Sequence, residues 1–435
     1  MPPLLPQSSI LLPQQWPFDL ALLPKPAYLV GGIVRDAFLG RRGDYLDLDF
    51  VLPKQAIEAA RRIAYHCNAG FVVLDAQRQI ARVVFDNATV DFALQEGDSL
   101  DADLRRRDFT VNAIAYNPHT QDLVDPLGGY QDLQQRQLRM VSVANLQDDP
   151  LRLLRAFRQA AQLNFRVDPE THATIAHLAT SLAHVAAERV QSELNCLLAY
   201  ADGSFWLRTA WHAGLLEYWL PSATESSLRQ LEALDRLPSA CALRRDRSWA
   251  QLTSLLLQPL EFSRNSLHPR TQLTLAKLAC LVDADPLLAE AHMQRLKYSR
   301  HETRAVGLLA RLCSQIQSAS VSTRAQYFIF QEIKELFPAL AALGLIQGRP
   351  NWLEAPEQLN HLVLKLIDAY LTPTNPVAHP QVLVTGKDLI QKLGLKPGPI
   401  IGELLTEIQV AQAEGKVRQK AEAIEFARRL YEFRG

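Results

Sequence analysis

The sequence predicts an α+β protein, in which an N-terminal part with a mixed β-sheet and flanking helices is followed by an all-helical remainder. Up to about residue 145 the chain is rich in strand signals, among them residues 46–51, which alternate at first with the two-residue period of a strand. From about residue 146, Leu-rich helical periodicity continues almost to the end of the chain. The 435 residues are 48% apolar and 21% charged, which is ordinary for a globular protein of several domains and excludes global disorder.

The N-terminal part contains five runs that are typical of strands. They are residues 27–30, 46–51, 71–74, 80–85 and 89–93. Asn87 lies between the last two runs and predicts a hairpin there. Helices are expected over residues 33–39, before Gly40, and over residues 55–66, after Pro53.

The helical part contains periodic segments that are separated by Pro and Gly. Clear examples are residues 151–163, 189–199, 271–281, 304–312 and 425–431. Asp149 before Pro150 is typical of a helix start, with Asp as the N-cap and Pro at the first helical position. Beyond residue 146 we therefore expect helices only.

Charge and cysteine content limit the classes of function. Lys plus Arg and Asp plus Glu are 46 each, so nucleic-acid binding would depend on local basic patches. The five cysteines are widely spaced without a CxxC pair, which excludes a zinc ribbon and is typical of a reducing compartment. No run of about 18 apolar residues occurs, and the Pro-rich residues 1–26 lack the basic start of a signal peptide. We expect a soluble, cytoplasmic protein.

Asp47 and Asp49 are the first candidate site. Residues i and i+2 of a strand point to one face, so Leu48 and Phe50 face the core and both carboxylates face away from it. Neighbouring carboxylates repel each other unless a cation lies between them, and Mg²⁺ prefers carboxylate oxygens. A simple solvated strand face remains the alternative.

Two further groups carry phosphate-binding chemistry. Gly31-Gly32, between a strand and a helix, would let backbone N–H groups approach phosphate oxygens, and Arg35 could neutralise a triphosphate. Arg105, Arg106 and Arg107 lie beside the apolar Phe109, which suits a phosphate or sugar clamp as well as an exposed basic turn.

Arginines also recur in the helix that follows Pro150. Arg152, Arg155 and Arg158 are three residues apart, so they wind around the helix instead of forming one solvated face. Such a stripe suits an extended polyanion or the wall of a pocket.

These groups occur in a definite order: Leu29-Val30-Gly31-Gly32-Ile33-Val34-Arg35-Asp36, Asp47-Leu48-Asp49, Arg106-Arg107-Asp108-Phe109-Thr110-Val111-Asn112-Ala113, and Asp149 with Arg152. Together they resemble the motifs of class II tRNA nucleotidyltransferases, a family of the polymerase-β nucleotidyltransferase superfamily that includes bacterial poly(A) polymerases. The resemblance is strong over residues 28–198 and thinner over residues 383–389 and 394–399.

The resemblance implies a domain order and a reaction. It implies a nucleotidyltransferase head at 27–145, a base-reading neck at 146–200, a body at 201–370 and a tRNA-binding tail at 371–435. The implied enzyme adds nucleotides of the 3′-terminal CCA to tRNA from CTP and/or ATP. It uses no nucleic-acid template, forms no covalent intermediate and releases pyrophosphate with the help of two Mg²⁺ ions. No stable protein partner is implied.

The resemblance also implies roles for single residues. Asp47 and Asp49 would be the catalytic metal ligands, and Asp91 a third acid. Gly32, Arg35 and Arg107 would hold the nucleotide, and Asp108 and Asn112 would orient its sugar. Asp149 and Arg152 would read the base, supported by Arg155 and Arg158.

Two departures from the family pattern bear on the subtype. The template motif begins Asp148-Asp149 where family members usually have Glu-Asp. The segment 94–103 is short, whereas complete CCA-adding members have a longer loop there, so the sequence resembles the relatives that add only the two cytidines.

Two other functions stay open at this stage. A poly(A) polymerase would be expected to end in a strongly basic extension, which the mixed-charge residues 422–435 are not. A non-catalytic RNA-binding relative would be expected to lack one of the two strand carboxylates. For binding the tRNA backbone, the sequence offers two basic clusters, which are Arg244, Arg245 and Arg247, and Lys416, Arg418 and Lys420.

Overall fold

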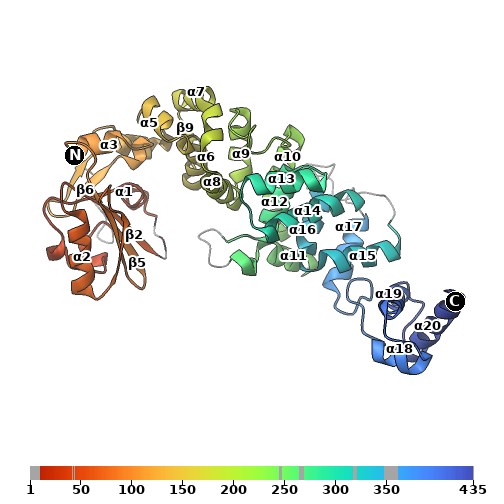
Figure 1. Ribbon diagram of the computed structural model, residues 1–435. Coiled ribbons are helices and arrows are strands. Elements are labelled where there is room, and N and C mark those ends of the chain that lie inside the picture. The colour runs from red at the N-terminus through yellow and green to blue at the C-terminus, as the bar shows by residue number, and fades with distance from the viewer. Residues whose placement is uncertain are drawn as a thin grey trace. The chain divides into compact units, whose positions relative to one another are not determined.

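The computed structural model describes residues 10–41, 43, 45–243, 247–263, 269–316, 321–346 and 361–434. The chain divides into two compact units, Met1–Val185 with Thr209–Leu215, and Ala186–Arg208 with Leu216–Gly435. Among the described residues, all strands belong to the first unit (Figure 1).

The first unit is built on a seven-stranded mixed sheet with the order β3-β4-β5-β2-β1-β6-β7. Within it β2 and β5 are parallel, and every other neighbouring pair is antiparallel. Its strands are β1 (Tyr28–Val30), β2 (Leu46–Leu52), β3 (Gly70–Asp75), β4 (Ile80–Val84), β5 (Ala88–Leu94), β6 (Ala115–Asn117) and β7 (Asp122–Val124). All five predicted strands and the hairpin at Asn87 are confirmed, and so is the α+β class.

Four short strands escaped the sequence analysis. They are β6 and β7 at one edge of the sheet, and the separate pair β8 (Gln137–Leu138) and β9 (Arg166–Val167). Strands of two or three residues show no readable period, because they form only where a partner lies beside them. The expectation that only helices follow residue 146 is therefore wrong at β9.

Aromatic packing explains why β2 turns its carboxylates away from the core. Phe50 of β2 stacks on Phe92 of β5 with ring centroids 5.3 Å apart, and Trp16 and Phe18 pack against this pair. Helix α2 (Ala56–Cys67) packs on β3, β4 and β5 (Figure 1). Since strand residues alternate, burial of Leu48 and Phe50 forces Asp47 and Asp49 to the opposite face.

In the sequence, the other helices of the first unit lie between the strands of the large sheet or after the last of them. They are α1 (Gly32–Phe38), α3 (Leu100–Arg105), α4 (Gly129–Gln135), α5 (Val143–Asp148), α6 (Leu151–Leu163) and α7 (Pro169–Leu178). The predicted cap of α6 is wrong by one residue, since Pro150 occupies the N-cap position. The Asp149 carboxylate instead accepts a hydrogen bond from the Leu151 N–H at 3.3 Å, because Pro has no N–H to offer.

The second unit is helical throughout its described part. Its helices are α8 (Ala187–Ala199), α10 (Glu225–Leu243), α11 (Arg247–Leu257), α12 (Gln272–Leu281), α13 (Pro286–Arg295), α14 (Arg300–Gln315), α15 (Thr323–Ile333), α16 (Phe337–Ile346), α17 (His361–Leu371), α18 (Gly386–Leu393), α19 (Pro399–Ala413) and α20 (Lys420–Arg434), and α9 (Gly203–His212) has residues in both units. Helix α16 is buried on all sides, as its wholly apolar sequence requires.

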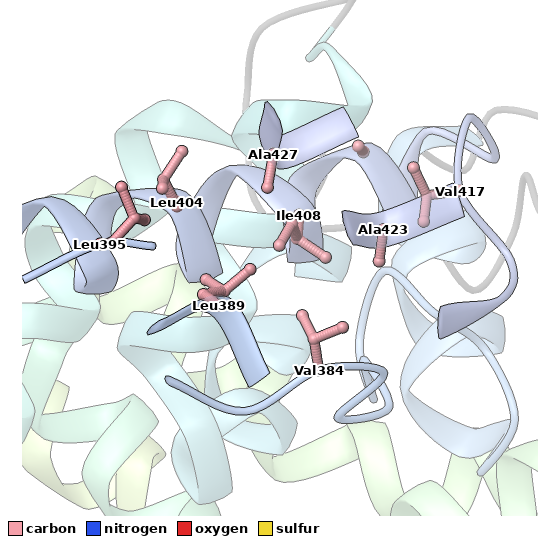
Figure 2. Packing of buried hydrophobic residues seen from close by; sticks show 9 residues of the cluster. Val384, Leu389, Leu395, Leu404, Ile408, Val417, Ala423 and Ala427 are labelled. Carbon is pink, nitrogen blue, oxygen red and sulfur yellow. The ribbon is translucent and has the colours of Figure 1, made fainter. Parts of the chain in front are cut away.

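The last three helices have a small hydrophobic core of their own. Figure 2 shows Leu389 of α18, Leu404 and Ile408 of α19, and Ala423 and Ala427 of α20 pointing toward one another. These side chains are at most 2% exposed. The core accounts for the Leu, Ile and Ala periodicity of this stretch. None of the helices in the described ranges is long and apolar enough to cross a membrane.

Candidate active site

The two carboxylates of β2 share one face of the sheet, as predicted. Asp47 is exposed and Asp49 half-buried, while Leu48 between them is buried. Burial, followed by the charges of Asp47 and Asp91, raises the pKa of Asp49 from 3.8 to about 6, although Arg107 and Arg82 oppose the rise. The Thr89 hydroxyl donates to Asp47 Oδ1 at 2.6 Å and so orients that carboxylate.

A third acid lies beside this pair. Asp91 of β5 is directly opposite Asp49 in the parallel register. Arg82 of β4 binds it in a bidentate manner, with Nε–Oδ1 at 2.7 Å and Nη2–Oδ2 at 2.8 Å. Both oxygens of Asp91 therefore already accept from a guanidinium, and a role of Asp91 as a metal ligand stays a prediction.

The turn before α1 brings the backbone close to the acids. Gly31 has φ +75°, a conformation that favours glycine. A Cβ at this position would lie 3.2 Å from Arg107 Nη1 and 4.0 Å from Asp49 Oδ2. Glycine therefore allows the turn, the Arg107 guanidinium and the Asp49 carboxylate to meet at one place.

Arg35 lies inside the protein. It is 6% exposed, pairs with Asp36 through Nε–Oδ1 at 2.9 Å and donates from Nη1 to Asn112 Oδ1 at 2.7 Å. Nη2 lies 3.4 Å from the place of a Cβ on Gly32, where the predicted nucleotide-binding turn runs. Contact of Arg35 or Gly32 with a triphosphate stays a prediction.

The three consecutive arginines have different surroundings. Arg105 pairs with Asp101 at 2.7 Å and Arg106 with Glu96 at 2.7 Å, and all four side chains are largely exposed. Arg107 is the one near Asp49, whose pKa its charge lowers, and its Nη2 lies 3.2 Å from Asp103 Oδ2.

The arginines of α6 also differ in their surroundings, as the winding of the stripe predicts. Arg152 Nη1 donates to the carbonyls of Arg106 at 3.1 Å and Asn145 at 2.9 Å. Arg155 Nε pairs with Asp108 Oδ2 at 3.0 Å, and Arg158 Nη1 donates to Gln162 Oε1 at 2.6 Å. Their roles and that of Asp149 in nucleotide binding are untested predictions.

Asp108 and Asn112 form a buried polar network with α6. Asn112 Nδ2 donates to Asp108 Oδ1 at 2.8 Å and to Gln159 Oε1 at 3.0 Å. Burial by itself raises the pKa of Asp108, but Arg155, Asn112 and the Phe109 N–H outweigh it and hold the pKa below its usual value. Both residues are thus engaged with protein groups, and contact with a sugar stays a prediction.

Gln159 is a member of this network that the sequence analysis missed. It is 1% exposed, and its Nε2 also donates to Asp108 Oδ2 at 3.3 Å. Its signal in the sequence is a polar residue between apolar positions of an amphipathic helix. That signal is weak, because it takes the tertiary structure to show which polar residues are enclosed.

The basic clusters proposed for RNA binding are only partly described. Arg244 and Arg245 lie outside the described residues, and Arg247 is an exposed residue at the start of α11. Lys416, Arg418 and Lys420 are exposed, although Lys416 pairs with Glu414 and Lys420 with Asp388, each at 2.6 Å.

The chemistry of the site suits a divalent cation that is shared with a substrate. In the described ranges, no group of three or more His, Cys, Asp and Glu could hold a metal ion alone. Asp47 and Asp49 supply hard oxygen ligands, and their mutual repulsion would be relieved by a cation. Mg²⁺ is typically bound by one or two carboxylates together with substrate phosphates, which fits these two residues.

Three family models match separate parts of the chain. Residues 93–139 match the model "Poly A polymerase head domain", residues 164–226 match "Probable RNA and SrmB- binding site of polymerase A", and residues 268–427 match "tRNA nucleotidyltransferase domain 2 putative". In structure, the chain resembles the Thermotoga maritima CCA-adding enzyme complexed with tRNA, with a TM-score of 0.66 and 23% identity over 92% of this chain and 90% of that one.

Curated relatives resemble the chain over nearly its whole length. A CC-adding tRNA nucleotidyltransferase of Synechocystis is 49% identical over 96% of this chain and 97% of its own. A CC-adding enzyme of Geobacter sulfurreducens is 34% identical over 91% and 90% of the two chains. An A-adding enzyme of Deinococcus radiodurans is 34% identical over 94% and 96%. These relatives, at 49% and 34% identity over nearly the whole of both chains, show that the chain is an enzyme of the tRNA nucleotidyltransferase family.

Proposed function

We propose that this enzyme is the CC-adding subtype, which transfers the two cytidines of the CCA end from CTP to the 3′ end of tRNA and releases pyrophosphate. The observation that carries the proposal is the short connection of residues 95–99 between β5 and α3. The 49% identity to a CC-adding enzyme supports the same subtype. The names of the relatives favour neither a poly(A) polymerase nor a non-catalytic RNA-binding protein.

The carboxylates of β2 would hold Mg²⁺, with Thr89 orienting Asp47. When bound, the cations would activate the RNA 3′-hydroxyl and stabilise the charge of the leaving pyrophosphate. Arg107 beside Asp49 would bind the triphosphate, and the Gly31 turn would let the backbone approach it. Arg35 would hold the Gly32 turn from within. Positioning and charge stabilisation account for most of the catalysis in phosphoryl transfer.

Base selection would fall to Asp149 and Arg152 at the start of α6. A carboxylate accepts from the exocyclic amino group that cytosine and adenine carry and uracil lacks. The Arg152 guanidinium would donate to ring or carbonyl acceptors, with Arg155 and Arg158 as supporting arginines. Unmatched polar groups would then disfavour UTP and GTP.

The test is an extension assay with single nucleotides on three tRNA transcripts. One transcript lacks the whole CCA end, one ends in both cytidines and one is complete. We expect two cytidines on the first transcript and no efficient addition to the other two. Rapid addition of adenosine to the transcript ending in both cytidines would show a complete CCA-adding or A-adding enzyme.

We further propose that the enzyme acts in the cytoplasm. The five cysteines are widely spaced without a CxxC pair, which supports a reducing compartment.

A further inference from the structure

Asp103 joins two segments of the head with one carboxylate. Its Oδ1 accepts from the Glu96 N–H at 3.0 Å, and its Oδ2 pairs with Arg107 Nη2 at 3.2 Å. The side chain is 8% exposed, so both contacts are shielded from water. The first contact holds the connection after β5, and the second holds the arginine that lies beside Asp49.

Helix α3, which contains Asp103, also carries a second Asp–Arg pair that lacks these features. Asp101 and Arg105 are also four residues apart, but their side chains are 50% and 53% exposed. An exposed pair of this kind contributes little to stability. The Asp103–Arg107 pair, at 8% and 24% exposure, is therefore the one with structural consequences.

Arg107 has three nitrogens in three different situations. Nη2 is held by Asp103, and Nη1 lies 3.2 Å from the place of a Cβ on Gly31. Nε is buried, and no protein acceptor in the described ranges bonds to it. The contact between Nη2 and the Asp103 carboxylate thus orients the guanidinium so that Nη1 faces the Gly31 turn near Asp49.

The connection itself is fixed at further points. The Gln95 N–H donates to the Leu52 carbonyl at 2.7 Å, and Glu96 pairs with Arg106 at 2.7 Å. Asp103 therefore links the connection, at Glu96, to the Arg107 guanidinium.

We propose that Asp103 is a positioning residue for nucleotide binding, which holds the Arg107 guanidinium in place for the triphosphate and ties the connection after β5 to it. The inference rests on the proposed function, in which Arg107 contacts the triphosphate. A guanidinium that is already ordered loses less conformational freedom when the anion binds, so its affinity for that anion is higher.

The experiment compares Asp103→Asn with the matched control Asp101→Asn. Steady-state KM for CTP, KM for tRNA lacking CCA, kcat and the thermal midpoint are measured for both variants. The Asn amide oxygen can still accept from the Glu96 N–H, so the substitution chiefly removes the charge that holds Arg107. We expect KM for CTP to rise at least about tenfold in Asp103→Asn, with KM for tRNA within about threefold of wild type. Asp101→Asn should leave all four quantities unchanged.

A double-mutant cycle with Arg107→Gln adds a second test. If Asp103 acts through Arg107, the double variant should have the same KM for CTP as Arg107→Gln alone. Additive effects, a normal KM in Asp103→Asn, or an equal rise in Asp101→Asn would each overturn the inference. Should Asp103→Asn fail to fold, Arg107→Lys takes its place. That variant leaves Asp103 and Glu96 bonded, and a normal KM for CTP in it would contradict the inference.

Failure of the proposed function would look different. A wild-type enzyme that adds only adenosine would refute the CC-adding subtype. Asp103→Asn and Asp101→Asn would then be compared by their KM for ATP. Arg107 would contact the triphosphate, which CTP and ATP share.

Discussion

The position of Asp49 lowers the stability of the folded protein when its carboxylate is ionised. Its carboxylate is held close to Asp47 and Asp91, and its pKa is raised to about 6 chiefly by burial. A carboxyl with a raised pKa prefers to be protonated in the folded state. Without a cation, stability therefore falls as pH rises from about 4 through about 6.

Asp49→Asn should separate the two roles of this residue. In a chelator, we expect the variant to be more stable than wild type by about 1–3 kcal/mol at pH 7 and to lose most of that advantage near pH 4. Nucleotide addition should fall at least about a hundredfold, because the cation that stabilises the transition-state charge would lose one of its carboxylate ligands. Thermal unfolding across this pH range and single-turnover addition measure the two effects. A variant with near-normal turnover would contradict the metal assignment, and the same stability difference at both pH values would contradict the pKa argument.

Helix α6 combines structural and proposed recognition roles within a few residues. Asp149 accepts a hydrogen bond at the start of the helix, while Arg155 and Gln159 reach the buried Asp108. Sequence periodicity predicted the bounds of α6 correctly, because its apolar face is long enough to read. The partners of Arg155 and Gln159 could not be predicted, since Asp108 and Asn112 are distant in the sequence.

Asp149→Ala should relax discrimination against UTP more than it weakens binding to tRNA. The loss of a helix-start hydrogen bond costs about 1 kcal/mol of stability whether or not Asp149 reads a base. Ser142→Ala is the matched control, because Ser142 caps α5 by accepting from the Asn145 N–H. The kcat/KM ratios for CTP and UTP and the Kd for tRNA distinguish the two roles. Unchanged CTP selectivity in Asp149→Ala would leave only the helix-start role.

The whole molecule has no net charge, so any attraction for tRNA must come from local clusters. In the tail, two of the three cluster residues are already paired with carboxylates. The number of phosphates that such a surface neutralises is therefore small, and its salt dependence should be moderate.

The affinity for tRNA should fall as salt rises from about 50 to about 200 mM. Arg418→Gln should weaken binding and reduce the slope of log Kd against log salt by about one. Arg300→Gln is the control, because Arg300 is exposed on a helix of the same unit outside both clusters. Binding that is flat between these salt concentrations would exclude a phosphate-contacting surface. An equal effect of both substitutions would exclude the tail cluster as the specific contact.

The sequence by itself determined the elements that are long enough to show a period and the residues whose order is characteristic. These include β2 with its two carboxylates on one face, the α2 and α6 helices, and the resemblance to tRNA nucleotidyltransferases. Such features depend on neighbours within a few residues along the chain, and alternation or helical spacing is sufficient to read them.

Only the tertiary structure decided which charged residues meet. It placed Arg35 inside the protein, brought Arg107 to the Gly31 turn and Asp49, and showed Asp103 and Gln159 as buried partners. It also produced the two-residue strands β8 and β9. A single polar residue or a very short strand owes its place to partners far away in the sequence. Local patterns do not encode that pairing, because burial and pKa depend on what the folded chain packs around each group.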